Sequence, residues 1–162
     1  MSDEPLVSVV LIGFNDVGRI GRALESIRRQ TLRSIEIIVV DDASTDGTAE
    51  YVESVAVNDS RIRLLLRSEN SGGCSAPRND GLRMARAPWV MFCDSDDEYD
   101  MHACATLLRA AEDWDADVVC GTAIRHDVAR DRDKRWRPEL HSADRLISSL
   151  EQVPELLYDT IS

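Results

Sequence analysis

The chain has 162 residues, of which 43% are apolar and 30% are charged. This composition excludes a disordered tail and a membrane-embedded protein, and the length supports one domain. The 19 basic and 30 acidic residues leave a net charge of −11, which repels phosphodiester backbones and anionic lipid. We therefore expect no nucleic-acid partner, and a phosphate-bearing ligand would need a local cation, a helix N-terminus or a divalent metal.

The cysteines and the N-terminal segment predict the compartment. No C-x-x-C pair is present, and the three histidines lack zinc-ligand spacing. We expect reduced, mostly buried thiols, as in cytoplasmic proteins. Met1 to Leu6 has no basic or apolar region and the longest apolar runs are strand-length, so we expect neither a signal peptide nor membrane insertion. The four cysteines are Cys74, Cys93, Cys104 and Cys120.

Short apolar runs alternate along the chain with segments of helical periodicity. The apolar runs predict strands at 7–12, 35–40, 62–66, 89–93 and near 117–120. The amphipathic segments predict helices at 18–30, 75–85 and 101–113, and another that is capped by Ser44 or Thr45. Such alternation predicts an α/β fold, a Rossmann-like three-layer α/β/α sandwich with a mostly parallel sheet.

The second part of the chain differs in character. Residues 1–125 are predicted to form the α/β core, and residues 126–162 a charged loop followed by two short helices that Pro154 separates. From His126 to Arg137, charges of both signs alternate with little apolar pattern. We favour a solvated loop or a β-excursion over a functional basic patch for this segment.

Polar residues gather where the predicted strands end. These clusters are Asn15 with Asp16, Asp41 with Asp42, Asn70, and Asp94 to Asp97. Ligands of parallel α/β sheets bind beyond the carboxyl ends of the strands. The clusters therefore predict a binding site there.

The sharpest of these clusters is Asp94-Ser95-Asp96-Asp97, directly after a predicted buried strand. Three carboxylates within four residues repel one another unless a positive charge neutralises them. A divalent cation would do so and could bridge a diphosphate at the same time. The alternative is an acidic helix N-terminus, stabilised by capping and by the helix dipole.

Two further clusters have both a functional and a structural interpretation. The segment from Asp41 to Thr48 contains a strand-end carboxylate that can accept a hydrogen bond from a base or a ribose, but it also suits a turn and helix cap. The Gly72-Gly73 loop with Arg78 can approach a phosphate group, but it also suits a tight strand-to-helix turn. No G-x-G-x-x-G or Walker loop is present.

Taken together, three segments resemble the N-terminal half of inverting family 2 glycosyltransferases. The segments are VSVVLIGFND, QTLRSIEIIVVDDASTDGTAE and RIRLLLRSENSGGCSAPRNDGLRMARAPWVMFCDSDD, and the resemblance covers Val7 to Gly121. It implies the GT-A type fold and a nucleotide-diphosphate sugar donor, with a UDP-sugar favoured. The Ala-Pro-Arg-Asn run resembles members associated with polymers of the bacterial cell envelope.

The resemblance implies a role for residues at the nucleotide end of the site. Gly13, Phe14 and Asn15 match the place where the family packs a uracil-like base, and Asp42, with Asp41 alongside, matches the aspartate that contacts the base. The residues that match the loop and helix lining the nucleotide pocket are Asn70, Gly73, Arg78 and Asn79.

The acidic motif of the family falls on Asp94, Asp96 and Asp97. The resemblance implies Mn²⁺ or Mg²⁺ as cofactor. Asp97 is predicted to be the direct ligand, Asp96 to contact the ribose or the metal, and Asp94 to be the outer member. The metal would stabilise the leaving diphosphate by electrostatics.

Two departures from the family pattern bear on specificity and turnover. The usual Pro-Thr-Tyr-Asn motif is Ile12-Gly13-Phe14-Asn15 here, so two polar contacts to the nucleotide are lost. No counterpart of the general base is found before Ser162, so no catalytic residue is assigned and the chain resembles a donor-binding half without its acceptor half. The acceptor is not specified by the sequence.

Other readings of the function follow from these departures. One is a nucleotide-sugar-binding module without turnover. A phosphoacceptor receiver domain is disfavoured, because the only lysine, Lys134, lies in the charged loop. Either a missing C-terminal domain or a homodimer would cover terminal apolar residues such as Leu156 and Ile161. We expect a cytoplasmic location, at the inner face of the membrane through other domains or partners.

Overall fold

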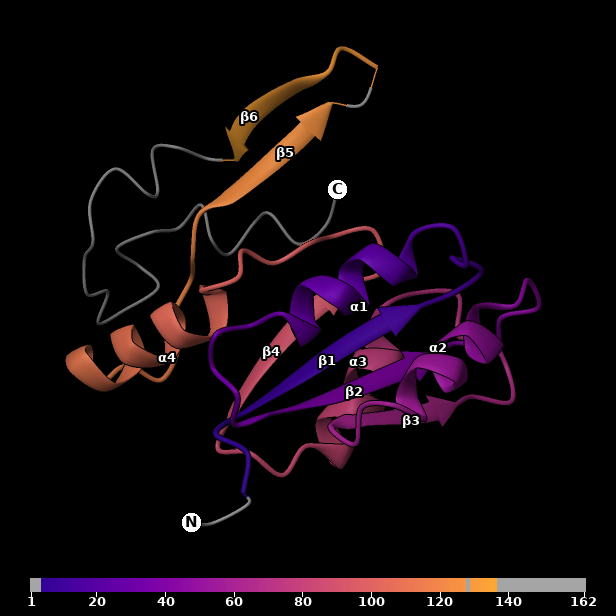
Figure 1. Cartoon of the computed structure of the whole chain (residues 1–162), viewed down its shortest axis with the longest axis horizontal. Coiled ribbons are helices and arrows are strands. Elements are labelled where there is room, and N and C mark those ends of the chain that lie inside the picture. Colours follow the sequence, from indigo (N-terminus) through magenta and orange to yellow (C-terminus); the bar gives the residue numbers. More distant parts are fainter. Residues whose placement is uncertain (1–3, 128, 137–162) are drawn as a thin grey trace. The chain divides into compact units, whose positions relative to one another are not determined.

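A computed structural model describes residues 4–127 and 129–136. By its contacts the chain divides into two compact units, Met1–Leu108 and Arg109–Ser162. The first unit contains a four-stranded sheet in the order β3-β2-β1-β4, with all neighbours parallel (Figure 1). Its strands are β1 (Val7–Gly13), β2 (Ile35–Asp41), β3 (Ile62–Leu66) and β4 (Trp89–Asp94).

Helices cover both faces of this sheet, which confirms the predicted α/β fold. The helices are α1 (Ile20–Arg28), α2 (Thr48–Ala56), α3 (Ser75–Met84) and α4 (Ala103–Trp114). The connections through α1 and α2 step along the sheet in one direction, whereas the connection through α3 steps back past β1 to β4. Because parallel crossovers are right-handed, α1 and α2 lie on one face and α3 on the other (Figure 1).

The two central strands explain why the sequence reads as continuous apolar runs. Every residue of β1 and β2 is buried, because neighbouring strands and covering helices leave none of their surface to solvent. Ile20, Leu24 and Ile27 of α1 pack on one face of the sheet. On the opposite face α3 lies so close that a Cβ at Gly81 would overlap the side chain of Val10.

Two predictions about local structure were wrong. Helix α2 begins at Thr48 after Gly47, which has a φ of 96°, and its first N–H is bonded to the carboxylate of Asp46 rather than to Ser44 or Thr45. Of the four thiols, only two are buried, since Cys74 and Cys120 are exposed. All four are free.

The second unit contains a two-stranded antiparallel sheet of β5 (Ala123–Asp127) and β6 (Arg132–Trp136). This hairpin agrees with the β-excursion expected for the charged segment. The strand predicted near 117–120 is wrong: these residues have no strand structure, and Val118 is exposed. A β-branched segment needs a neighbouring strand, and none pairs with it in the part of the chain that the structure describes.

The remaining predictions for this region lie outside the described residues. They are the two helices of residues 141–162 and the contacts of Leu156 and Ile161. The domain division at residue 125 stays a prediction. Within the described ranges, no helix has the length and apolar character needed to span a bilayer.

Candidate functional site

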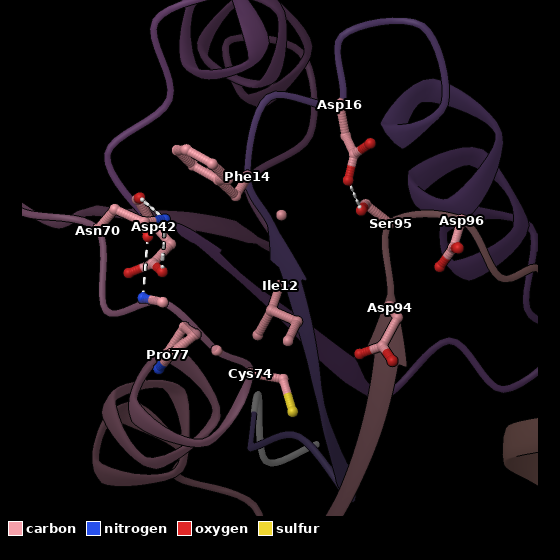
Figure 2. A pocket seen from close by; sticks show the side chains of 13 residues that line it. Ile12, Phe14, Asp16, Asp42, Asn70, Cys74, Pro77, Asp94, Ser95 and Asp96 are labelled. Carbon is pink, nitrogen blue, oxygen red and sulfur yellow. Dashed lines mark hydrogen bonds between the residues drawn. The ribbon is translucent and has the colours of Figure 1, made fainter. Parts of the chain in front are cut away.

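A pocket of about 450 Å³ opens at the carboxyl ends of β1, β2 and β4. Figure 2 shows two sides of it: Phe14, Asp42 and Asn70 lie on one, and Asp94, Ser95 and Asp96 on the other. The residues that line it are Ile12, Gly13, Phe14, Asp16, Asp42, Asn70, Gly72, Gly73, Cys74, Pro77, Asp94, Ser95 and Asp96.

The connectivity of the sheet explains the position of this pocket. From β1 the chain goes to β2 and β3 on one side, and then returns to β4 on the other side of β1. The loop after β1 therefore leads to α1 on one face of the sheet and the loop after β3 leads to α3 on the other, which leaves a crevice at the ends of the strands. This is where ligands of open α/β sheets bind, so the strand-end clusters of the sequence meet where a ligand site is expected.

Asp42 is held firmly at one side of the pocket. Its Oδ1 accepts a hydrogen bond from Arg67 at 2.6 Å, and its Oδ2 accepts bonds from the backbone N–H and hydroxyl of Ser71 and the side-chain amide of Asn70. Burial alone would raise the pKa of Asp42, but the bonds from Ser71 and Arg67 outweigh it and lower the pKa below its usual value. Asp42 is therefore an ionised carboxylate with four protein donors, of which Oδ1 accepts only one and so can accept a further N–H from a ligand.

The same side of the pocket offers an aromatic ring and a glycine loop. Phe14 follows β1 and remains 44% exposed, although large apolar side chains are usually buried. Gly72 has a φ of 73° and needs to be glycine for that conformation. Gly73 has no such requirement, and a Cβ there would meet no protein atom within 4 Å. The protein's own contacts thus leave space beside Gly73 for a ligand to approach the backbone.

The opposite side of the pocket is the acidic segment, residues 94–97. Helix α4 begins only at Ala103, so this segment is not the first turn of a helix and the capping interpretation does not apply. Arg78 binds both carboxylate oxygens of Asp94, at 2.7 and 2.8 Å. Among the residues that the structure describes, Asp96 has only a distant ion pair, 3.9 Å from Arg19. Burial and the neighbouring Asp96 and Asp94 raise the pKa of Asp97.

These charges fit a divalent cation. One of the three carboxylates is neutralised by Arg78, which leaves Asp96 and Asp97 as two negative charges with little compensation. Within the described ranges, no group of three or more His, Cys, Asp or Glu side chains is placed to hold a metal. Mg²⁺ at nucleotide sites commonly uses one or two carboxylates together with substrate phosphates, so two free carboxylates are a sufficient protein contribution.

The loop that carries these acids is anchored to α1. The buried Gln30 donates from its amide to the backbone oxygen of Asp100, and its Oε1 accepts the N–H of Cys104. The N–H of Tyr99 donates to the hydroxyl of Ser26, and the hydroxyl of Tyr99 donates to the backbone oxygen of Phe92. The far end of the segment after β4 is thereby fixed, although it has no regular secondary structure.

Most of the residues predicted from the sequence meet at this pocket. Seven of them line it, namely Gly13, Phe14, Asp42, Asn70, Gly73, Asp94 and Asp96. Five do not, namely Asn15, Asp41, Arg78, Asn79 and Asp97. Arg78 is bonded to Asp94, and Asn79 is exposed. Whether each residue contacts a ligand stays a prediction.

Asn15 and Asp41 support the loops that frame the pocket. Asn15, with a φ of 51°, accepts the N–H of Thr45 on its side-chain oxygen, and its own N–H donates to the hydroxyl of Ser44. Asp41 is buried and accepts the N–H of Ser44, while its Oδ1 has no partner among the described residues. Asn15 therefore ties the loop after β1 to the loop after β2, and Asp41 holds the start of the loop after β2.

Several lining residues were not predicted as site residues. Asp16, Ser95, Cys74 and Pro77 all face the pocket. Asp16 and Ser95 stand within strand-end clusters that the sequence did show, so their position was a usable signal. Pro77 belongs to the Ala-Pro-Arg-Asn run noted in the sequence, but neither Pro77 nor Cys74 was expected to line the pocket, which they reach at the start of α3.

An open parallel α/β sheet with a polar pocket at its switch point defines a class of ligand-binding domain. The chain belongs to glycosyl transferase family 2, because the protein-family sequence model described as "Glycosyl transferase family 2" matches residues 8–156. The family predicted from the sequence is thus confirmed.

One curated relative is the GalNAc(5)-diNAcBac-PP-undecaprenol beta-1,3-glucosyltransferase of Campylobacter jejuni. It is 35% identical over 123 residues, which are 76% of this chain and 40% of the relative. The chain spans about two fifths of the length of the curated relatives that it matches.

Two solved structures are similar in fold. TarS of Staphylococcus aureus in complex with UDP-GlcNAc has a TM-score of 0.62 and 31% identity, and covers 66% of this chain and 31% of its own. The mannosyltransferase PcManGT of Pyrobaculum calidifontis, in complex with GDP-Man and Mn²⁺, has a TM-score of 0.60 and 30% identity. It covers 74% of this chain and 34% of its own. The predicted GT-A fold class is therefore confirmed.

Proposed function

We propose that this chain is the donor-binding half of a metal-dependent, inverting glycosyltransferase. It takes a nucleotide-diphosphate sugar, with a UDP-sugar favoured, and transfers the sugar to an acceptor hydroxyl. The observation that carries the proposal is the two-sided pocket of Figure 2, with an aromatic ring and a fixed carboxylate on one side and the acidic segment that contains Asp96 on the other. Family membership and the UDP-GlcNAc and GDP-Man complexes of the similar structures support it.

At the nucleotide end, the chain's residues would bind and orient the base. The exposed ring of Phe14 offers a face for stacking. Asp42, held in place by its four present donors, would accept an N–H of the base on Oδ1, which restricts the base to one orientation. The open space beside Gly73 would let the diphosphate approach the backbone.

At the other end, Asp96 and Asp97 would hold Mn²⁺ or Mg²⁺. When bound, the cation supplies positive charge that stabilises the leaving diphosphate. Arg78 neutralises Asp94, so the two remaining carboxylates match one divalent charge. The Mn²⁺ in the PcManGT complex supports this part of the proposal.

The transfer itself is a substitution at the anomeric carbon of the sugar. The acceptor oxygen forms the new glycosidic bond as the bond to the diphosphate breaks, and the hydroxyl proton passes to a general base. We assign no described residue to that base. We place the reaction in cell-envelope polymer synthesis on the cytoplasmic face of the membrane, because the Campylobacter relative's name specifies an undecaprenol-linked acceptor.

The test is calorimetric titration of UDP, GDP and CDP into the chain, with and without Mn²⁺. We expect one nucleotide to bind in a metal-dependent manner, and Asp97→Asn to abolish the metal-dependent part. Glu53→Gln is the matched control, because it removes one negative charge from an exposed position on α2 and should bind as the native chain does.

Two results would contradict the proposal. If the native chain binds none of the three nucleotides in the presence of Mn²⁺, the donor site is wrong. If Asp97→Asn binds with native affinity and native dependence on Mn²⁺, the metal assignment is wrong. Release of nucleotide from the matching sugar donor then distinguishes an enzyme from a binding module.

A further inference from the structure

Asp16 lies between three segments that each follow a strand. Its backbone oxygen accepts the N–H groups of Arg19 and Ile20 at the start of α1, and its own N–H donates to the hydroxyl of Thr48 at the start of α2. Its carboxylate Oδ1 accepts Arg19, and its Oδ2 accepts the hydroxyl of Ser95. One residue therefore connects the loop after β1 with the first turn of α2 and the acidic segment after β4.

The bond between Asp16 and Ser95 joins the loop after β1 to the acidic segment on one side of the pocket (Figure 2). The pairing of β1 with β4 ends at Ile12 and Asp94. Beyond that point no sheet hydrogen bonds join the segments that follow the two strands. Ser95 is the first residue beyond the ladder, and Asp16 is the residue that holds it. Without this contact, nothing in the strand pairing positions the acidic segment relative to the loop after β1.

Burial makes the contact specific. Ser95 is 6% exposed, and the side chain of Asp16 is 10% exposed. Ser95 lies over the end of β1, where a Cβ at Gly13 would come within 3.6 Å of its own Cβ. A hydroxyl enclosed in this way needs a partner, and the carboxylate of Asp16 provides it.

We propose that Asp16, through the hydroxyl of Ser95, is the positioning residue of the donor site, fixing where the carboxylates of Asp96 and Asp97 stand. The inference rests on the proposed function and extends it to residues that touch neither base nor metal in that proposal. Arg19, bonded to the same carboxylate, lies 3.9 Å from Asp96 and completes the link between the two segments.

Ser95 offers a matched pair of substitutions. Threonine and valine have nearly the same shape, but only threonine keeps a hydroxyl. We expect Ser95→Val and Asp16→Ala each to weaken Mn²⁺-dependent UDP binding by about 10-fold, the loss seen when a group that orients a metal ligand is removed. Ser95→Thr should recover most of that loss. The double variant Asp16→Ala with Ser95→Val should lose no more than Asp16→Ala alone, because that substitution already removes the bond.

Hydrogen exchange of residues 94–100 gives a readout that needs no nucleotide. Exchange in this segment should be faster in Ser95→Val and Asp16→Ala than in Ser95→Thr. Ser54→Val, on the exposed face of α2, is the control: it makes the same serine-to-valine change away from the pocket. This variant should match the native chain in both measurements. If valine or threonine disturbs folding at Ser95, as thermal unfolding would show, Ser95→Ala removes the hydroxyl without adding volume.

The outcomes separate this inference from the proposed function. If the native chain fails to bind nucleotide with Mn²⁺, the proposed function is wrong, and unchanged exchange in Ser95→Val would show the positioning inference to be wrong as well. If exchange accelerates but Mn²⁺-dependent binding is equal in the valine and threonine variants, the bond is structural only and the inference is overturned. A loss in the double variant equal to the sum of the two single-variant losses would also overturn it.

Discussion

Two buried carboxylates with similar partners lie at opposite ends of the sheet. Glu36, near the start of β2, accepts bonds from the hydroxyl of Ser8, from Arg63 and from Arg86. Asp42, just after β2, accepts bonds from the hydroxyl of Ser71, from Arg67 and from Asn70. Both have a serine hydroxyl and an arginine, and both are at most 3% exposed.

The two clusters differ in what lies beside them. Asp42 lines the pocket, whereas Glu36 is not among its lining residues. The bonds of Glu36 instead join β1, β2 and β3 to the turn after α3, where Arg63 also donates to the backbone oxygen of Met84. In both clusters hydrogen bonds outweigh burial and lower the carboxylate pKa. A buried, ionised carboxylate therefore does not identify a ligand site by itself; its position at the carboxyl end of the sheet does.

The largest effect on both clusters is expected from α3, because each cluster depends on the seating of that helix. Asp80 of α3 binds Arg67 at one end, and Met84 accepts Arg63 at the other. Gly81→Ala would force a Cβ into the side chain of Val10, and we expect a loss of about 2–3 kcal/mol in the free energy of unfolding, measured by denaturant titration. Gly18→Ala is the control, since a Cβ there meets no atom within 4 Å. Equal stability of the two variants would show that α3 is not closely seated.

Neutralising each carboxylate with its isosteric amide tests the comparison directly. In Glu36→Gln and Asp42→Asn, an amide NH2 replaces one carboxylate oxygen and faces the hydrogen-bond donors that this oxygen accepted. We expect each substitution to cost about 1–2 kcal/mol of folding stability. Only Asp42→Asn should also weaken nucleotide binding by the folded chain. Calorimetry at a temperature where both variants are folded measures this difference. Loss of binding in Glu36→Gln would remove the distinction between a structural and a ligand-binding carboxylate.

A smaller effect is expected from acid. Because the folded-state pKa values of Glu36 and Asp42 are lowered, their stabilisation is complete above the unfolded pKa and disappears as pH falls through the folded pKa. Native stability should therefore fall below about pH 5, and less steeply in Glu36→Gln and Asp42→Asn. The contribution of Asp97 to the pH dependence of stability has the opposite sign, because its raised pKa in the folded state means that protonation favours folding. Denaturant titrations between pH 3 and 7 compare the slopes, and parallel slopes for all three chains would contradict the expectation.

The elements that the sequence predicted well are those whose surroundings are uniform. The four strands of the first unit are apolar throughout or nearly so, because both faces of a parallel sheet are covered, and this pattern is local. The segment near 117–120 has a similar apolar character, yet it is not a strand. Strand formation depends on a neighbour to pair with, and residue type alone does not specify one.

The site was predictable to the extent that its residues follow strands. Parallel strands bring their carboxyl ends to one edge, so Asp42, Asn70 and Asp94 were expected to meet there, and they do. The partners of these groups were not predictable. Arg78 was expected to face a phosphate and instead binds Asp94, and nothing in the sequence pairs Asp16 with Ser95, 79 positions away.

The sequence by itself determined the family, the alternation of strands and helices, and the strand ends at which chemistry is concentrated, because hydrophobic periodicity and motif order are properties of short segments. Tertiary structure alone decided which carboxylates are neutralised and which stay free. The donors that make the difference, Arg67 and Ser71 for Asp42 and Arg78 for Asp94, come from other segments of the chain. The charge available to a ligand depends on these long-range pairs, and they form only when the sheet is assembled.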